Sequence, residues 1–373
     1  MKVPFYTSTR EYQKYKSEFD SAVEAVMARG DFILGADVAE FEKEAAEYLG
    51  VKYAVGMANG SDALVIASDI LGFKDGAEVL TPTFTFFAST SCVARLGGKP
   101  VLVDMDEETL NMSIKDAERR MGKNTKGIIP VHLFNQATPM AQVMRLAEKH
   151  RLKVLEDSAE AWGMECNMGG AWKKAGTIAD IGIYSFFPTK TLGAYGDAGL
   201  AVSNNEELYK KLKSYRVHGS SVKYHHDYVG YNSRLDTMQA AILRVKLKRT
   251  EEAIAARARI ARHYTERLKD IPGLRIPYIL PENRAVNYVY NILVSKRDEL
   301  SKHLTENGIG WSVYYPIPLH MQKCFAHLNY KEGDFPVAER VCKEVIALPI
   351  FPELEENEVD YVCDTIKAFY QRN

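Results

Sequence analysis

Short β-rich runs alternate with helical stretches from about residue 50 to residue 205, and this alternation constrains the fold more than any other feature. KYAVGMA (52–58), AEVLTPTFTFFAS (77–89) and KPVLVDMD (99–106) are three such runs, and helical spacing follows the first two. This alternation is typical of an α/β layered domain with a mostly parallel sheet. Ligands of such sheets gather at the carboxyl ends of the strands, so we look for a site there.

The last third of the chain has a different pattern. A long helical segment follows VGYNSRLD (229–236) and meets no proline before Pro272, which with Gly273 provides a stop. Strands and helices then continue to the end as a smaller α+β unit. We therefore expect an N-terminal segment and large α/β domain over 1–250 and a small C-terminal domain over 251–373, joined by the long helix.

Composition excludes several functions. The 48 Lys and Arg residues balance 49 Asp and Glu residues, which argues against nucleic acid or an anionic membrane as a partner. The five cysteines are scattered without a C-x-x-C pair, so we expect reduced thiols in a cytoplasmic protein and no metal site. No segment has the roughly 18 consecutive apolar residues that a membrane-spanning helix needs.

One lysine stands in an unusual setting. In SFFPTKTLGAYGDAG (185–199), Lys190 comes just after an apolar run and just before a glycine-rich stretch. An apolar environment disfavours the charged form of a lysine, which lowers its pKa and frees the amine to form an imine with a carbonyl. Ser185 in the same stretch has a hydroxyl that suits a phosphate. A solvated surface lysine is the ordinary alternative.

Three further features complete one constellation with Lys190. Asp157 ends the predicted strand LKVLED, where an acid is placed to hold a protonated ring nitrogen. Gly60 and Ser61 lie between a strand and a helix, a junction that binds anions. Phe86 follows a strand end, where it can stack on a planar ring. Each feature has an ordinary alternative, because Asp157 can form a turn or cap, Ser61 can be an N-cap and Phe86 can pack in the core. Together with Lys190, however, they predict pyridoxal phosphate (PLP).

The ordered motifs of the chain resemble the DegT/DnrJ/EryC1/StrS family of PLP-dependent aminotransferases that act on nucleotide-linked keto-sugars. The resemblance implies a fold type I structure and assigns roles to matching residues. Lys190 matches the lysine that bonds to the cofactor, Asp157 the partner of the pyridine nitrogen, and Phe86 the stacked aromatic. Ser61, Asp62 and Ser185 match phosphate-binding positions. The resemblance is carried by FILGADVAEFEKEAAEYLGVKYAVGMANGSDAL, PVLVDMD, VHLFNQ, EDSAEAWG, SFFPTKTLGAYGDAG, GYNSRLDTMQAAIL, YYPIPLH and EGDFPVAERVCKEVIALPIFPEL.

The same resemblance implies a homodimer with shared active sites. Asn232 in GYNSRLD matches an asparagine that reaches the cofactor phosphate of the neighbouring subunit, and Tyr314 and His320 in YYPIPLH match positions near the sugar nucleotide. Glu160 stands at a cofactor-binding position where the family usually has glutamine. Other departures are Trp162 for a common histidine, Asn135 for a usual glycine and Thr191 for a common asparagine.

The implied reaction moves an amino group from an amino acid, by family analogy glutamate, to a nucleotide-linked keto-sugar, with pyridoxamine phosphate (PMP) as intermediate. The pattern REYQKYKSEFDSAVEAVMARGDFILG (10–35) is more similar to members that act on 3-keto sugars, so we expect a dTDP- or UDP-linked 3-keto hexose. The alternatives are a 4-keto-sugar aminotransferase, a PMP-dependent sugar dehydratase and a non-catalytic regulatory protein. Dehydratases carry histidine in place of the lysine. The basic run RVKLKR (244–249) is either a pyrophosphate contact or a solvated helix face.

Overall fold

The computed structural model describes residues 1–372, and its centre is a seven-stranded sheet. The strand order is β1-β9-β8-β5-β4-β2-β3, and β9 alone in this sheet runs against the others. The expected α/β fold with a mostly parallel sheet is confirmed. The strands are β1 (Tyr53–Met57), β2 (Glu78–Pro82), β3 (Lys99–Val103), β4 (Thr125–Ile128), β5 (Lys153–Asp157), β8 (Ile181–Ser185) and β9 (Gly199–Ser203).

Both faces of this sheet are buried. Along β8, Ile181 and Ile183 join the apolar cluster on one face, whereas Tyr184 joins the cluster on the other, as the two-residue period of a strand requires. This double burial explains why the strands read as continuous apolar runs. One face packs on α4 (Gly60–Ile70), α5 (Ala88–Arg95) and α8 (Glu206–Tyr215), and the other on α3 (Ala36–Leu49), α6 (Ile114–Arg120), α7 (Met140–His150) and α9 (Thr237–Leu247).

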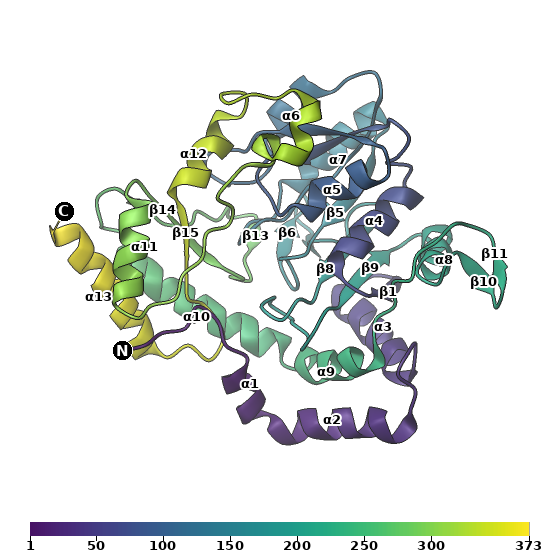
Figure 1. Cartoon of the computed structure of the whole chain (residues 1–373), viewed down its shortest axis with the longest axis horizontal. Coiled ribbons are helices and arrows are strands. Elements are labelled where there is room, and N and C mark those ends of the chain that lie inside the picture. The colour runs from purple at the N-terminus through teal and green to yellow at the C-terminus, as the bar shows by residue number, and fades with distance from the viewer. Residues whose placement is uncertain (373) are drawn as a thin grey trace.

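A smaller unit follows, built on an antiparallel three-stranded sheet of order β12-β14-β15. Figure 1 shows this unit beside the large sheet, with α10 running between them. Val3 is fully buried in its core and bridges to Ile309, so the first residues of the chain pack on this unit. Its elements are α10 (Thr250–Leu268), β12 (Leu274–Arg275), β14 (Tyr290–Val294), α11 (Arg297–Glu306), α12 (Pro336–Glu344), β15 (Val345–Leu348) and α13 (Glu356–Arg372).

Short elements complete the fold. The hairpin of β10 and β11 projects from the large domain beyond α8 (Figure 1). β13, β6 and β7 form a second small sheet. The bounds are α1 (Thr9–Lys14), α2 (Lys16–Arg29), β6 (Glu165–Asn167), β7 (Trp172–Lys174), β10 (Ser220–Val222), β11 (His225–His226), β13 (Asn283–Arg284), η1 (Leu319–Met321) and η2 (Lys323–Leu328).

The predicted long helix is broken into α9 and α10 around residue 249, and no proline or glycine marks the break. The basic run beside the break forms ion pairs with the N-terminal helices. Lys246 pairs with Glu11 at 2.7 Å, and Arg249 pairs with Glu18 at 2.5 Å. Arg244 likewise pairs with acids of α3. Arg244, Lys246 and Arg249 therefore hold α1, α2 and α3 by ion pairs and are not free for a pyrophosphate, whereas Lys248 is exposed.

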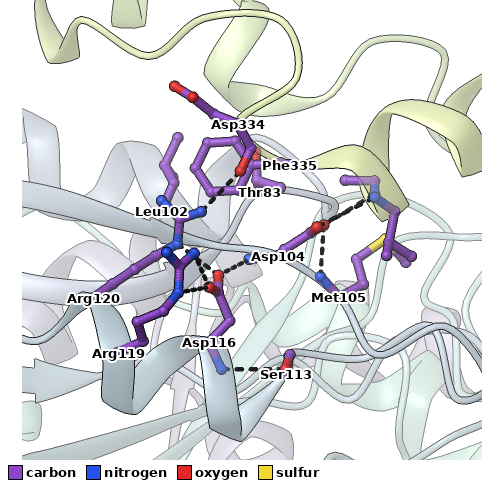
Figure 2. A network of polar contacts seen from close by, with 12 residues as sticks. Thr83, Leu102, Asp104, Met105, Ser113, Asp116, Arg119, Arg120, Asp334 and Phe335 are labelled. Carbon is purple, nitrogen blue, oxygen red and sulfur yellow. Dashed lines mark hydrogen bonds and ion pairs between the residues drawn. The ribbon is translucent and has the colours of Figure 1, made fainter.

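The N-terminus of α12 is capped by a residue of the large domain. The preceding residue, Phe335, makes no side-chain capping bond. Asp104, just after β3, instead accepts hydrogen bonds from the backbone N–H groups of Val337 at 3.2 Å and Ala338 at 3.0 Å (Figure 2). A carboxylate at a helix N-terminus satisfies free N–H groups and also interacts favourably with the helix dipole.

A second layer holds Asp104 in place. The carboxylate of Asp116 accepts from the Asp104 backbone N–H at 2.9 Å and from Arg120 Nε at 2.6 Å. The Arg120 guanidinium lies 4.1 Å from the centre of the Phe335 ring and donates to the Asp334 carbonyl oxygen at 2.9 Å. Together these three residues, Asp104, Asp116 and Arg120, fix the loop before α12 to the large domain.

Replacing Asp104 by alanine is expected to lower the free energy of unfolding by about 1–3 kcal/mol, because the change removes a helix cap and leaves buried N–H groups without partners. Urea unfolding followed by circular dichroism measures the loss. Asp106→Ala is the control, since Asp106 is exposed and its carboxylate accepts from the nearby residues Glu108 and Thr109. Equal losses in the two variants would contradict the capping role.

Candidate active site

The predicted site residues lie at one edge of the large sheet. β1, β2, β5 and β8 run in the same direction, so their carboxyl ends meet at that edge. Gly60 follows β1, Phe86 follows β2, Asp157 ends β5 and Ser185 ends β8, and Lys190 comes five residues after Ser185. The topology therefore gathers residues that are far apart in sequence, as expected for this class of sheet.

A candidate anion-binding cradle lies where α4 begins. The helix is capped by the Asn59 side chain, which accepts the Asp62 N–H at 2.8 Å, so Ser61 is not the cap. A helix leaves its first four N–H groups without helical acceptors, and those of Gly60 and Ser61 remain for an anion. A Cβ added to Gly60 would lie 2.8 Å from the Ser185 Cβ. Only glycine allows this approach, which brings the Ser185 hydroxyl beside the helix terminus.

Asp157 is a buried acid with two hydrogen bonds. Its side chain accepts from Ser89 Oγ at 2.6 Å and from the Ala159 N–H at 3.1 Å. Burial raises the pKa of Asp157, while these hydrogen bonds and the nearby Lys190 and His132 work in the opposite direction. The hydrogen bond from the Ala159 N–H belongs to the turn after β5. Asp157 therefore forms a turn and also lies at the carboxyl edge of the sheet.

Lys190 lies in an anionic setting. Its Nζ is 3.4 Å from Glu160 Oε1 and 4.4 Å from the centre of the Tyr288 ring. Burial lowers the pKa of Lys190, but its electrostatic interactions with Tyr288, Glu160 and Asp157 and its contact with the Tyr288 hydroxyl outweigh burial, and the pKa is raised above its ordinary value. The expectation of a lowered pKa is therefore wrong for the chain without a ligand, because an apolar run in sequence does not reveal which acids lie opposite in space.

Glu160 links the lysine to the C-terminal part of the chain. Its Oε2 accepts the Phe134 N–H at 3.0 Å, which leaves Oε1 facing Lys190. Tyr315 Oη lies 3.5 Å from the same Oε1. The carboxylate that replaces the family's glutamine is therefore paired with a cation and fixed by a backbone group.

Three aromatics follow β2, and their exposure separates their roles. Phe84 is 1% exposed and belongs to the core, as the packing alternative predicts. Phe86 is 57% exposed, and its ring centre lies 6.3 Å from that of Tyr315. A large exposed aromatic at the sheet edge has a free face on which a planar heterocycle can stack. Phe87 is also exposed, but its ring packs on Phe325.

The remaining predicted residues differ in accessibility. Asn232 is exposed, and Tyr314 is partly buried with its ring 6.3 Å from Phe5. His320 has no exposed side-chain area, and its ring nitrogens lie 2.9 Å from Thr83 Oγ1 and 3.0 Å from Glu339 Oε1. Burial lowers the pKa of His320. Both ring nitrogens are paired within the chain, and the expected place of His320 near the sugar nucleotide stays a prediction.

Sequence reasoning missed three residues of the site. Ser89 contacts Asp157, Tyr288 contacts Lys190, and Tyr315 lies between Glu160 and Phe86. Tyr315 stands in the quoted motif YYPIPLH, but Ser89 and Tyr288 lie in ordinary helical and strand patterns that carry no signal. Within residues 1–372, no group of three or more His, Cys, Asp or Glu side chains could hold a metal ion. None of the helices in that range has the length and apolar character of a membrane crossing.

The residues present fit PLP. The cradle at Gly60, Ser61 and Ser185 suits its phosphate, the free face of Phe86 suits its ring, and Asp157 suits a protonated ring nitrogen. Lys190 supplies a primary amine for its aldehyde. An arrangement of this kind can hold an electron-accepting ring and move a proton beside it.

Comparison with known proteins agrees with this fit. A pleiotropic regulatory protein of Geobacillus stearothermophilus is 43% identical over 100% of this chain and 99% of its own length. UDP-N-acetyl-3-dehydro-alpha-D-glucosamine 3-aminotransferase of Acidithiobacillus ferrooxidans is 39% identical over 98% of this chain and 97% of its own length. The crystal structure of S. venezuelae DesV in complex with a ketimine intermediate is 34% identical, covers 100% of this chain and 99% of that chain, and has a TM-score of 0.96. The profile of the DegT/DnrJ/EryC1/StrS aminotransferase family matches residues 13–367, and the chain belongs to this PLP-dependent family.

Proposed function

We propose that the protein transfers an amino group from glutamate to the C3 carbon of a UDP- or dTDP-linked 3-keto hexose, and that Lys190 and Asp157 are its catalytic residues. The observation that carries the proposal is the meeting of a lysine amine, a buried acid and an anion cradle at one sheet edge. The relative from Acidithiobacillus is named for amination of a UDP-linked sugar at C3, which supports the choice of carbon.

Each residue has a separate task. Bound PLP supplies an electron-accepting ring that stabilises negative charge next to the reacting carbon. Lys190 binds the cofactor covalently and then, once released, carries a proton to and from the carbon that bears the amino group. Asp157 keeps a proton on the ring nitrogen. Gly60 and Ser185 hold the phosphate, so the reacting atoms return to one position in both half-reactions.

A regulatory protein without chemistry is the second candidate, because the relative from Geobacillus carries that name. A regulatory protein needs neither a lysine beside a buried acid nor an anion cradle, and this chain has both. A PMP-dependent dehydratase is disfavoured by Lys190 itself, since the dehydratases carry histidine at that position. A 4-keto-sugar aminotransferase shares all of these residues and must be separated by experiment.

We also propose a homodimer with shared active sites, located in the cytoplasm. Asn232, the candidate contact to a partner's cofactor phosphate, is exposed, and Val222 in the preceding hairpin and Val229 just after that hairpin are 63% and 95% exposed. A second copy of the chain would cover such residues. The five cysteines are unpaired, which suits a reducing compartment.

The test incubates purified protein with glutamate and either a UDP-linked 3-keto or a UDP-linked 4-keto hexose, followed by product mass and by NMR assignment of the aminated carbon. The proposal expects a C3 amino sugar and 2-oxoglutarate in equal amounts, and dTDP-linked sugars are tested in parallel. A C4 product identifies the alternative aminotransferase, and loss of the 3-hydroxyl identifies a dehydratase. No product with any sugar or donor contradicts an enzyme of this class.

Glu160→Gln is expected to speed the attachment of PLP to the cofactor-free protein severalfold at neutral pH. Attachment needs the unprotonated amine, and Glu160 is one of the negative groups that raise the pKa of Lys190. Removing its charge lowers that pKa, so more free amine is present at a given pH. The rise of the cofactor's absorption band with time gives the rate.

Glu165→Gln is the matched control, because Glu165 lies 3.5 Å from the ammonium group of a different lysine, Lys174. Its attachment rate should equal that of the wild type. An unchanged or slower rate in Glu160→Gln would show that the Glu160 charge does not hold the proton on Lys190.

A further inference from the structure

We propose that Ser89 is a positioning residue that keeps the Asp157 carboxylate ionised and aimed at the cofactor ring nitrogen. The inference rests on the proposed function, because Asp157 has this task only when PLP is bound. Ser89 lies in α5, directly after the segment that carries Phe86. It therefore couples the helix behind the ring-stacking aromatic to the acid at the end of β5.

The geometry around Ser89 forms a chain of hydroxyl groups. Ser89 Oγ donates to Asp157 Oδ2 at 2.6 Å, and Thr85 Oγ1 lies 3.1 Å from Ser89 Oγ. Because Ser89 has one hydroxyl proton and donates it to Asp157, Thr85 must be the donor in the second contact. Thr85 and Ser89 are 2% and 1% exposed, so water does not compete for either bond.

The direction of these bonds decides their effect. A hydrogen bond donated to a carboxylate favours its charged form, and a donor that itself accepts a hydrogen bond donates more strongly. Asp157 needs such support, because its burial favours the neutral acid. A neutral Asp157 would leave the ring nitrogen without a counter-charge, and the ring would accept electrons less readily.

Within residues 1–372, one other hydrogen bond fixes the orientation of the Asp157 side chain, from the Ala159 N–H to Oδ1. Together the two donors hold both carboxylate oxygens and set the plane of the group. A carboxylate has about four acceptor positions, so capacity remains for a ring N–H. Ser89 therefore restricts the rotation of the Asp157 carboxylate and leaves some of its acceptor positions open.

A neighbouring hydroxyl provides the control. Thr90 is the next residue of α5 and is fully buried, but its Oγ1 donates to Thr81 Oγ1 at 3.0 Å and not to Asp157. A change at Thr90 removes a buried hydrogen bond of the same helix, with a comparable effect on stability. It leaves the bond between Ser89 and Asp157 in place.

The test loads wild type, Ser89→Ala, Ser89→Thr and Thr90→Ala with PLP labelled with nitrogen-15 in the ring and records the chemical shift of that nitrogen. The rate of the half-reaction with glutamate and urea unfolding are measured on the same samples. In Ser89→Ala we expect the nitrogen chemical shift to move toward that of unprotonated pyridine. We also expect the half-reaction to be about ten- to a hundredfold slower, which corresponds to the loss of a hydrogen bond to a charged group. Ser89→Thr and Thr90→Ala should keep the wild-type shift.

An unchanged nitrogen shift in Ser89→Ala would overturn the inference, and so would equal rate losses in Ser89→Ala and Thr90→Ala. Thr85→Val, which removes only the outer hydroxyl, should give a smaller shift in the same direction. If instead the proposed function is wrong, the wild-type protein itself will neither retain the cofactor at Lys190 nor react with an amino donor.

Discussion

Lys190→Ala is expected to reduce amino transfer by about 10⁴-fold or more. The variant loses the covalent attachment of the cofactor and also the group that moves the proton, and the second task alone contributes about 10²- to 10⁴-fold. Because Lys190 is held between Glu160 and Tyr288 with only 14% of its side chain exposed, no other amine replaces it in place. Formation of 2-oxoglutarate from glutamate with a keto-sugar acceptor measures the loss.

A second lysine of the chain is a close control for this variant. Lys174 lies 3.5 Å from Glu165 and 4.4 Å from the centre of the Tyr48 ring, and its exposure is similar to that of Lys190. Lys174→Ala therefore removes an equivalent ion pair and ring contact away from the sheet edge. It should keep near-wild-type activity, and a Lys190→Ala enzyme as fast as Lys174→Ala would refute the catalytic assignment.

Asp157→Asn is expected to reduce the rate by about 10²- to 10⁴-fold, because removing one partner of a buried charged pair costs about 3–5 kcal/mol. The amide keeps the shape of the side chain but holds no negative charge opposite the ring nitrogen. The rate of the half-reaction with glutamate under single-turnover conditions isolates this step.

The loss should be confined to the chemical step. Asp157→Asn protein should still attach PLP at Lys190, because attachment depends on the lysine amine and the phosphate cradle at Gly60 and Ser185. A variant that reacts at the wild-type rate would show that Asp157 only shapes the turn after β5. A variant that binds no cofactor would assign Asp157 to binding and not to the reaction.

Much of the fold could be predicted because its determinants are local. Alternating apolar runs and helical stretches indicated a mostly parallel sheet, and a parallel sheet brings the ends of its strands to one edge. Lys190 and Asp157 could be singled out because each stands where a predicted strand or apolar run ends. Gly60 gave a weak signal, and the structure gives it a physical reason in the close approach of Ser185.

The errors all concern contacts between distant parts of the chain. The pKa of Lys190 is raised by Tyr288 and Glu160, and the sequence does not show that Tyr288 packs on the lysine. The pairing of His320 with Thr83 and Glu339 is also a contact that the motif YYPIPLH does not reveal. The break between α9 and α10 likewise depends on no local signal that we could read.

The proposed reaction requires PLP to bond covalently to Lys190. Borohydride reduction of the PLP-loaded protein, followed by proteolysis and mass spectrometry of the peptides, tests it most directly. We expect a single pyridoxyl adduct on the peptide that contains Lys190, and none in Lys190→Ala. An adduct on Lys174 or scattered over surface lysines, or no adduct at all, would contradict it.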